Sequence, residues 1–238
     1  MNKSVIKLIF LAACILFSGA ASAQNEKQIR SDLQKKIGSN NKIKSVAQSP
    51  IPGVYEVIIG NDIIYTDANS KYLIQGEIIE LASGKSITEQ RQNDLNRIKW
   101  SDLNTADALK VVRGDGSRQL AIFSDPNCGY CKRLEKSLQE IDNVTVYTYL
   151  IPILGADSTK KSRQIWCSKD PQKTYDNWML NGNSPTGNGE CTTPLDKNLA
   201  FAKTYGVTAT PTLFFTDGSR FPGAARVTDI EQKFSTLK

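Results

Sequence analysis

The feature that most constrains the fold is a pair of cysteines, Cys128 and Cys131, placed between two short segments of different character. Residues 119–123 form an apolar run of strand type, and apolar residues between 134 and 141 then recur at helical spacing. A thiol at the start of a helix faces the positive end of the helix dipole and free backbone N–H groups, which favour its thiolate form. The pattern predicts a redox-active CxxC motif, with Cys128 as an exposed nucleophile and Cys131 as the resolving thiol.

Two other interpretations of the CxxC motif are a structural disulfide and half of a zinc site. The chain contains no histidine, so a zinc ion would need Cys167 and Cys191 as its further ligands. Both are far from the motif in sequence, and no second CxxC exists. The pattern therefore favours a redox pair, and we expect no metal and no other cofactor.

The first 23 residues have the pattern of an export signal. Two lysines precede an apolar segment, residues 8–17, that is too short to span a bilayer, and Ala21-Ser22-Ala23 is typical of a cleavage site. The alternative is a lipoprotein box ending at Cys14, which would carry a lipid. We expect cleavage after Ala23 and a periplasmic protein, because the four remaining cysteines, an even number, suit an oxidising compartment.

The overall charge argues against one class of partner. The chain carries a formal net charge of +6, but its lysines and arginines form no dense block. We therefore expect no binding to nucleic acid. A length of 238 residues suits one large or two small domains.

Residues 24–84 are expected to form a small N-terminal α+β domain. A helix over residues 26–37 precedes short strands and polar turns between residues 43 and 82. A unit of this size buries little apolar surface, and it has no cysteine to staple it. We therefore expect it to form a homodimer, with a monomer packed on the second domain as the alternative.

Residues 85–105 are expected to form a linker helix. The sequence Ser86-Ile87-Thr88-Glu89 has the pattern of a capping box, in which the serine and glutamate side chains each bond a backbone N–H at the start of a helix. The helix that it opens, through about Lys99, is polar on most of its surface. Such a helix is typical of a solvated connection between domains.

Residues 106–238 are expected to form an α/β domain with a mixed sheet covered by helices, which makes the chain as a whole an α+β protein. Asp217-Gly218 is a strong turn pair and predicts a hairpin, and Asp170-Pro171 predicts the start of a helix. The expected elements in order are a short helix around 106–110, a strand at 119–123, the CxxC helix, a strand at 144–151, a helical insertion at 157–180, a surface loop at 181–194, a helix at 199–205, the hairpin and a C-terminal helix.

Three segments of the second domain resemble the DsbC family of periplasmic thiol:disulfide interchange proteins. They are residues 123–131 around the cysteines, residues 165–170 and residues 206–211, and residues 72–76 match a stretch of that family's N-terminal domain. The resemblance implies a thioredoxin-like catalytic domain with a helical insertion, a dimerising N-terminal domain, and two active sites facing a shared cleft. The Gly129-Tyr130 dipeptide favours DsbC over DsbG, which usually has Pro-Tyr, and over DsbA, which usually has Pro-His.

The resemblance also implies roles for individual residues. Cys128 and Cys131 would be the catalytic pair. The bond between Thr210 and Pro211 would be cis, so that the backbone of Thr210 faces the sulfurs and pairs with a client chain. We interpret Tyr130 as a further substrate-binding residue, because it lies between the two thiols and must be partly exposed.

Two further expectations concern residues outside the motif. The resemblance implies a structural disulfide between Cys167 and Cys191, with a second redox pair as the alternative. Thioredoxins carry a buried acid six residues before the first cysteine, and here that position is Ile122. Proton handling at the thiols must therefore come from elsewhere.

The function implied is a disulfide isomerase and reductase that acts on misfolded, disulfide-containing exported proteins through the Cys128–Cys131 dithiol. That activity requires a reduced dithiol, so the expected electron donor is a membrane reductase of the DsbD type. Two alternatives stay open. One is a DsbG-like reductase of single oxidised cysteines, and the other is a holdase chaperone that binds unfolded chains through apolar surface.

Overall fold

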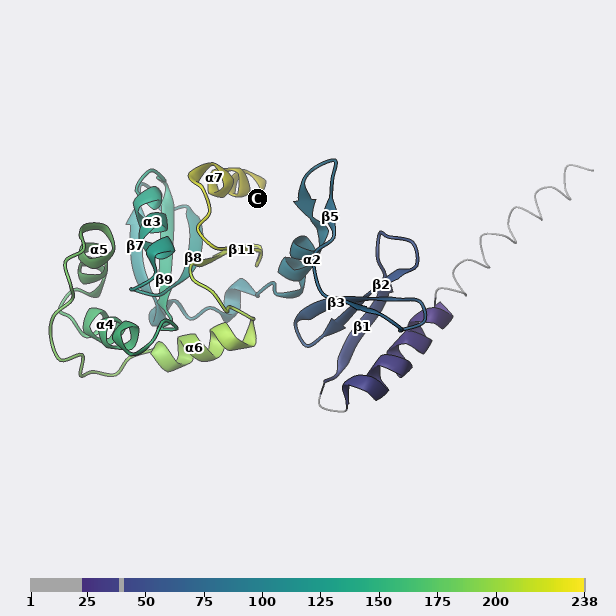
Figure 1. Cartoon of the computed structure of the whole chain (residues 1–238). Coiled ribbons are helices and arrows are strands. Elements are labelled where there is room, and N and C mark those ends of the chain that lie inside the picture. The colour runs from purple at the N-terminus through teal and green to yellow at the C-terminus, as the bar shows by residue number, and fades with distance from the viewer. Residues whose placement is uncertain (1–22, 39–40, 238) are drawn as a thin grey trace, which may run out of the picture. The chain divides into compact units, whose positions relative to one another are not determined.

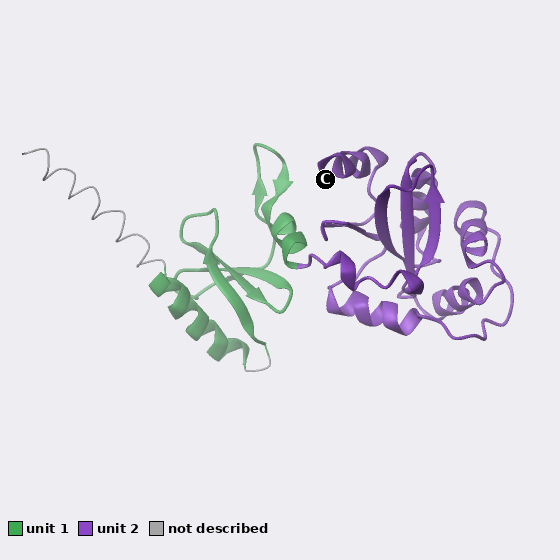
Figure 2. Ribbon diagram, turned by 180° about the vertical axis from the view of Figure 1, so that it is seen from behind, with its two compact units in different colours: residues 1–95 green, residues 96–238 purple. Residues whose placement is uncertain are grey.

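The computed structural model describes residues 23–38 and 41–237. The chain divides into two compact units, residues 1–95 and residues 96–238, which Figure 2 colours separately. The predicted export signal lies outside the described residues except for Ala23, and so does Cys14. None of the helices within the described ranges is long and apolar enough to cross a membrane.

Unit 1 is built from one helix, residues 23–37, packed on an antiparallel sheet. The apolar residues Ile29 and Leu33 lie one turn apart on the helix and are buried against Val57 in the middle of the sheet. The sheet has the order β1 (Ile43–Gln48), β2 (Val54–Ile59), β3 (Asp62–Asp67) and β4 (Leu73–Ile74).

A small hairpin and a short helix complete unit 1. Strands β5 (Ile79–Glu80) and β6 (Lys85–Ser86) pair with each other and lead into α2 (Ile87–Leu95). The Ser86 hydroxyl oxygen accepts a hydrogen bond from the backbone N–H of Glu89 at 3.0 Å, so the serine half of the predicted capping box is present. Thr88 then joins α2 to β3, because its hydroxyl bonds the Tyr65 hydroxyl at 2.6 Å.

The expected linker helix over 85–105 is wrong beyond Leu95. The chain leaves the helix there because the buried Ile98 donates its backbone N–H to the carbonyl of Gly218, 3.1 Å away. Gly218 has a φ of +81°, and a Cβ atom at that position would lie 2.0 Å from the Ile98 carbonyl oxygen, so only glycine fits this contact. Two 3-10 turns follow, Trp100–Asp102 and Thr105–Asp107.

Unit 2 contains a five-stranded mixed sheet. The central pair, β8 and β9, is parallel, and every other pairing in this sheet is antiparallel. The helix expected around 106–110 is present only as the 3-10 turn Thr105–Asp107, because residues from Leu109 onward form an edge strand along β9. The order across the sheet is β11 (Arg220–Pro222), β10 (Thr212–Phe215), β8 (Arg118–Ser124), β9 (Val144–Leu150) and β7 (Leu109–Arg113).

Helices cover both faces of this sheet, which explains the unbroken apolar run in β8. Leu120 and Ile122 face one cluster, with residues of α3 (Gly129–Leu138) and α7 (Val227–Thr236). Ala121 and Phe123 face the other, with residues of α6 (Leu195–Thr204). Strand β8 is thus held from both sides, and it ends directly before the loop that carries the cysteines.

The predicted helical insertion is present as α4 (Ala156–Trp166) and α5 (Pro171–Asn181), which lie side by side (Figure 1). The Asp170 side chain accepts a hydrogen bond from Lys173 N and caps α5, with Pro171 in its first turn. Ile165, Tyr175 and Met179 of the insertion are buried in one cluster with Cys128 and Cys131. The small α+β unit followed by this sheet-and-helix unit is the fold class predicted from the sequence.

Candidate active site

The first cysteine of the motif caps α3. Cys128 is the residue before the helix, and its Sγ accepts a hydrogen bond from the backbone N–H of Cys131 at 3.3 Å. Its own N–H donates to the carbonyl of Asp125 at 3.0 Å, which fixes the turn between β8 and α3. A sulfur in this position receives the free N–H groups of the first helical turn, and these stabilise negative charge. Both thiols are free.

A second segment, 82 residues further along the chain, closes over Cys128. The Thr210–Pro211 peptide bond is cis, and the Cys128 thiol lies 3.2 Å from the Thr210 carbonyl oxygen, to which it can donate. This packing corrects one expectation: Cys128 is only 6% exposed, because the cis-proline loop and the apolar cluster of the insertion cover it. The sequence pattern around Cys128 indicates neither the cis-proline loop nor the apolar cluster as its neighbour.

The second cysteine has a different environment. Cys131 is 1% exposed, and burial raises the pKa of its thiol to about 12. Hydrogen bonds from the Ser124 hydroxyl and from the backbone at Asp125 act in the opposite direction, and the neighbouring Cys128 sulfur raises the pKa further. At neutral pH Cys131 is therefore a protonated thiol that must lose a proton before it can react.

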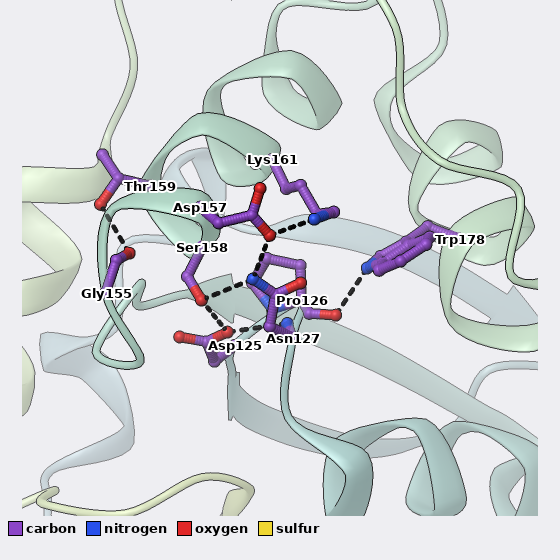
Figure 3. A network of polar contacts seen from close by, with 9 residues as sticks. All are labelled: Asp125, Pro126, Asn127, Gly155, Asp157, Ser158, Thr159, Lys161 and Trp178. Atoms are coloured by element: carbon purple, nitrogen blue, oxygen red, sulfur yellow. Dashed lines mark hydrogen bonds and ion pairs between the residues drawn. The ribbon is translucent and has the colours of Figure 1, made fainter.

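A polar network holds the loop before the cysteines against α4 (Figure 3). The buried Asp125 carboxylate accepts hydrogen bonds from the backbone N–H of Asn127 at 2.8 Å, the backbone N–H of Leu154 at 3.0 Å and the Ser158 hydroxyl at 2.7 Å. The Asn127 amide donates to Asp157 and to Ser158. Sequence analysis missed this network. Asp-Pro-Asn is a sequence typical of a turn, but the partners of Asp125 lie about thirty residues away, where local spacing does not indicate them.

Trp178 of α5 supports the same loop. Its indole N–H donates to the Pro126 carbonyl, and two ammonium groups lie over its ring, Lys132 at 3.6 Å and Lys161 at 5.0 Å from the centroid. Burial lowers the pKa of Lys132, and the like charges of Lys161 and Lys136 lower it further. Lys132 therefore packs on the insertion.

An open groove of about 480 Å³ adjoins the dithiol. Tyr130 is 58% exposed at its wall, and the Arg133 guanidinium lies 4.3 Å from its ring centroid. The groove reaches the cis-proline loop, and it is lined by Tyr130, Arg133, Leu134, Ser137, Thr210 and residues 223–226. The structure thus brings Tyr130 and Thr210, two residues far apart in sequence, to one surface beside the sulfurs.

Cys167 and Cys191 are joined by a disulfide, with their Cα atoms 5.6 Å apart. Cys167 directly follows α4, and Cys191 lies in the loop after α5. The bond therefore closes a loop of chain that contains all of α5, the helix that packs on α3.

A buried parallel strand, a CxxC motif capping the next helix and a cis-proline loop facing the first sulfur define a class: thiol:disulfide oxidoreductases of the thioredoxin fold. Comparison with family models agrees with this class and refines it. Residues 105–238 match the thioredoxin-like domain, and residues 20–89 match the disulfide bond isomerase protein N-terminal domain.

Similar proteins place the chain in a particular family. It is 41% identical over 191 residues to the "Probable thiol:disulfide interchange protein DsbC" of Bordetella pertussis, covering 80% of this chain and 68% of that protein. It is 26% identical to the thiol:disulfide interchange protein DsbC of Escherichia coli K12, covering 94% and 91%. The crystal structure of a disulfide interchange protein from Neisseria gonorrhoeae superposes with a TM-score of 0.53 at 34% identity, covering 56% of this chain and 96% of that one. The chain belongs to the DsbC family.

Proposed function

We propose that this protein is a periplasmic disulfide isomerase and reductase that acts through the Cys128–Cys131 dithiol. The observation that carries the proposal is the Thr210 carbonyl facing Cys128 Sγ, with the buried Cys131 three residues further along the chain. This arrangement provides a nucleophile, a resolving thiol and a backbone edge for a client at one place. Membership of the DsbC family supports the same activity.

The reaction follows from the two sulfur environments. The Cys128 thiolate attacks one sulfur of a client disulfide, forms a mixed disulfide and releases the other client sulfur as a thiolate. That thiolate can attack a second disulfide of the client, and the thiolate released there attacks the client sulfur of the mixed disulfide. A new client disulfide forms, the Cys128–client bond breaks, and Cys128 leaves as a thiolate, which completes an isomerisation. If the client thiolate does not attack, Cys131 attacks Cys128, the Cys128–client bond breaks, and the client leaves reduced. The oxidised pair then needs two electrons, which we assign to a membrane reductase of the DsbD type.

Clients are held, we infer, beside Tyr130, Thr210 and Pro211. The groove there is open and presents an aromatic face and a backbone edge, which suit an extended, unfolded chain of variable sequence. Misfolded exported proteins with wrong disulfides are the clients that this surface and this chemistry fit. In this arrangement the Cys167–Cys191 disulfide is structural and takes no part in turnover.

The domain roles belong to the same proposal: an export signal at 1–23, a dimerisation domain at 24–84, a linker at 85–105 and a catalytic domain at 106–238. Strand β4 supports dimerisation, because it is the edge of its sheet and two large apolar residues at it, Tyr72 and Leu73, are 61% and 52% exposed. A second copy of the chain would cover this edge. The expected compartment follows from the predicted signal and the family.

The test uses a model protein whose disulfides have been scrambled. Wild type should restore its native activity, Cys128→Ala should lose that rescue entirely, and Cys131→Ala should accumulate a covalent mixed disulfide visible on a non-reducing gel. Suppression of aggregation is measured in parallel. Rescue by Cys128→Ala at the wild-type rate would contradict the proposal, and aggregation suppression that survives in it without rescue identifies a holdase contribution.

A further inference from the structure

A chain of buried hydroxyl groups leads away from the resolving thiol. The Ser124 hydroxyl, at the end of β8, lowers the pKa of the Cys131 thiol. Its Oγ also lies 2.8 Å from the Tyr175 hydroxyl oxygen, and either group can donate in that contact. Tyr175 in turn donates to Glu135 Oε1 at 2.9 Å. A hydrogen-bonded chain thus runs from Ser124 through Tyr175 to the Glu135 carboxyl group, and Tyr175 also packs in one buried cluster with Cys131.

All the members of this chain are buried. Tyr175 is fully enclosed, Ser124 is 1% exposed and Glu135 is 5% exposed. Glu135 lies four residues after Cys131 on α3, so it points toward the insertion from the helix that carries the thiols. Burying a carboxyl group costs folding free energy, so packing alone does not explain a glutamate at this position.

The groups around Glu135 leave it poised to change protonation near neutral pH. Burial raises its pKa to about 7, and Asp176 of α5 raises it further. The hydrogen bond from Tyr175 and the charge of Arg113 on β7 lower it. Cys131 and Tyr175 are the other titratable groups on this chain, and burial raises the pKa of both. Glu135 is therefore the one member of the chain that can be ionised at pH 7 and take up a proton.

We propose that Glu135 is the proton acceptor for Cys131 and acts on it through Tyr175 and Ser124. The inference rests on the proposed function, because it concerns the step in which Cys131 resolves a mixed disulfide. Glu135 would also supply the acid group that is missing at Ile122, the position where thioredoxins carry a buried acid.

The step is balanced in atoms and electrons. The thiol proton of Cys131 passes to Ser124 Oγ, the Ser124 proton passes to the Tyr175 oxygen, and the Tyr175 proton passes to Glu135. The Cys131 sulfur then forms a bond with Cys128 Sγ, and the bond between Cys128 and the client sulfur breaks. The client leaves as a thiolate with the electron pair of that bond, Cys128 and Cys131 become oxidised, and Glu135 is left neutral.

The experiment mixes the reduced protein with an aromatic disulfide that releases a coloured thiolate at each step. The first release reports attack by Cys128, and the second reports attack by Cys131. For the wild type, the rate of the second release should rise with pH up to about 7 and then level off. In Glu135→Gln the first release should be unchanged, and the second should be slower at pH 8 by on the order of 100-fold, with a rate that keeps rising above pH 7.

Two variants separate proton transfer from packing. Tyr175→Phe keeps Glu135 but breaks the chain, so it should reproduce the slow second release, and the double variant should be no slower than either single one. Glu140→Gln, an exposed glutamate just after the same helix, is the matched control and should behave as wild type. A second release within twofold of wild type in Glu135→Gln, with the same pH profile, overturns the proposal.

Failure of the proton-transfer proposal can be distinguished from failure of the proposed function. Absence of the first release in the wild type would mean that Cys128 is not the nucleophile, and the proposed function would fail. In that case, proton transfer from Cys131 to Glu135 is tested by measuring the ¹³Cβ chemical shift of Cys131 as a function of pH. An inflection near pH 7 that disappears in Glu135→Gln supports the chain, and its absence in the wild type overturns it.

Discussion

At the scale of single residues, the two sulfurs of one motif differ because of where each lies on α3. Cys128 precedes the helix and receives the N–H of Cys131, whereas Cys131 is inside the first turn and points into the cluster with Tyr175. The first position favours a charged sulfur and the second penalises it. A difference of one helical turn thus separates the proposed nucleophile from the proposed resolving thiol.

Glu135 also affects stability in a pH-dependent way. Its pKa is raised from an ordinary value of 4.5 to about 7 in the folded protein, so folding favours the protonated form. Its contribution to the free energy of unfolding is therefore full below pH 4.5 and is lost as the pH rises to about 7. Glu135→Gln does not titrate. Between pH 5 and pH 8, the free energy of unfolding of this variant should rise relative to wild type by about 2 kcal/mol.

Urea unfolding at the two pH values measures this difference directly. The exposed Glu140→Gln variant serves as the control and should show no such change relative to wild type. A difference in the free energy of unfolding between Glu135→Gln and wild type that stays constant across this range would contradict the prediction. It would mean that the Glu135 carboxyl is already ionised in the folded protein at pH 5.

At the scale of elements, the insertion supports the active site. The Ser158 hydroxyl of α4 donates a hydrogen bond to Asp125 in the loop, and the Trp178 indole of α5 donates one to the Pro126 carbonyl (Figure 3). Helix α5 also contributes Tyr175, which bonds Glu135 of α3. The thiols thus lie between a sheet and two helices that come later in the chain. Anything that holds α4 and α5 together also holds the loop in place.

The Cys167–Cys191 disulfide is the covalent part of that support. The bond spans 24 residues of sequence, and removing a cross-link of this length costs about 3 kcal/mol through the entropy of the unfolded chain. The double variant Cys167→Ser/Cys191→Ser should therefore melt at a lower temperature. At low temperature it should still reduce a small disulfide through Cys128 at nearly the wild-type rate.

Calorimetry and the two-step release assay together check this prediction. Loss of reduction with an unchanged melting temperature would identify the pair as a second redox centre that passes electrons to Cys128–Cys131. A lower melting temperature with reduction intact confirms the structural role.

At the scale of the whole molecule, the two units differ in how much of their sheets is covered. Unit 2 has a sheet covered on both faces. In unit 1 the main sheet packs on the helix of residues 23–37, and Tyr72, Leu73 and Ile74 stay exposed at its β4 edge. An uncovered apolar edge strand invites pairing with another chain. Unit 1 is therefore the part of the protein suited to holding two copies together.

The prediction for the mature protein is a dimer by light scattering at micromolar concentration. Leu73→Lys places a charge on the β4 edge and should shift the mass toward the monomer, with reduction of a small disulfide retained and rescue of a scrambled protein lost. Val112→Lys is the matched control, because Val112 is also 52% exposed but lies in unit 2. A wild-type monomer, or equal dissociation in both variants, would contradict dimerisation through unit 1.

Some features of this protein follow from the sequence alone, because they depend on neighbours only a few residues apart. The CxxC motif between a strand and a helix, the Ser86 cap of α2, the Asp170-Pro171 start of α5 and the Asp217-Gly218 hairpin are local in this sense. Each was predicted from spacing and turn chemistry, and each is present. Membership of the DsbC family was likewise visible in short segments.

The tertiary structure decided what depends on partners far along the chain. Residues from Leu109 form a strand instead of a helix because β9 offers an edge to pair with, and α2 ends early because Ile98 pairs with Gly218. Cys128 is covered by a carbonyl 82 residues away. The link from Ser124 to Tyr175 and Glu135 joins residues 51 and 40 positions apart. Periodicity and spacing describe which residues an element exposes, but only packing determines which side chains meet there.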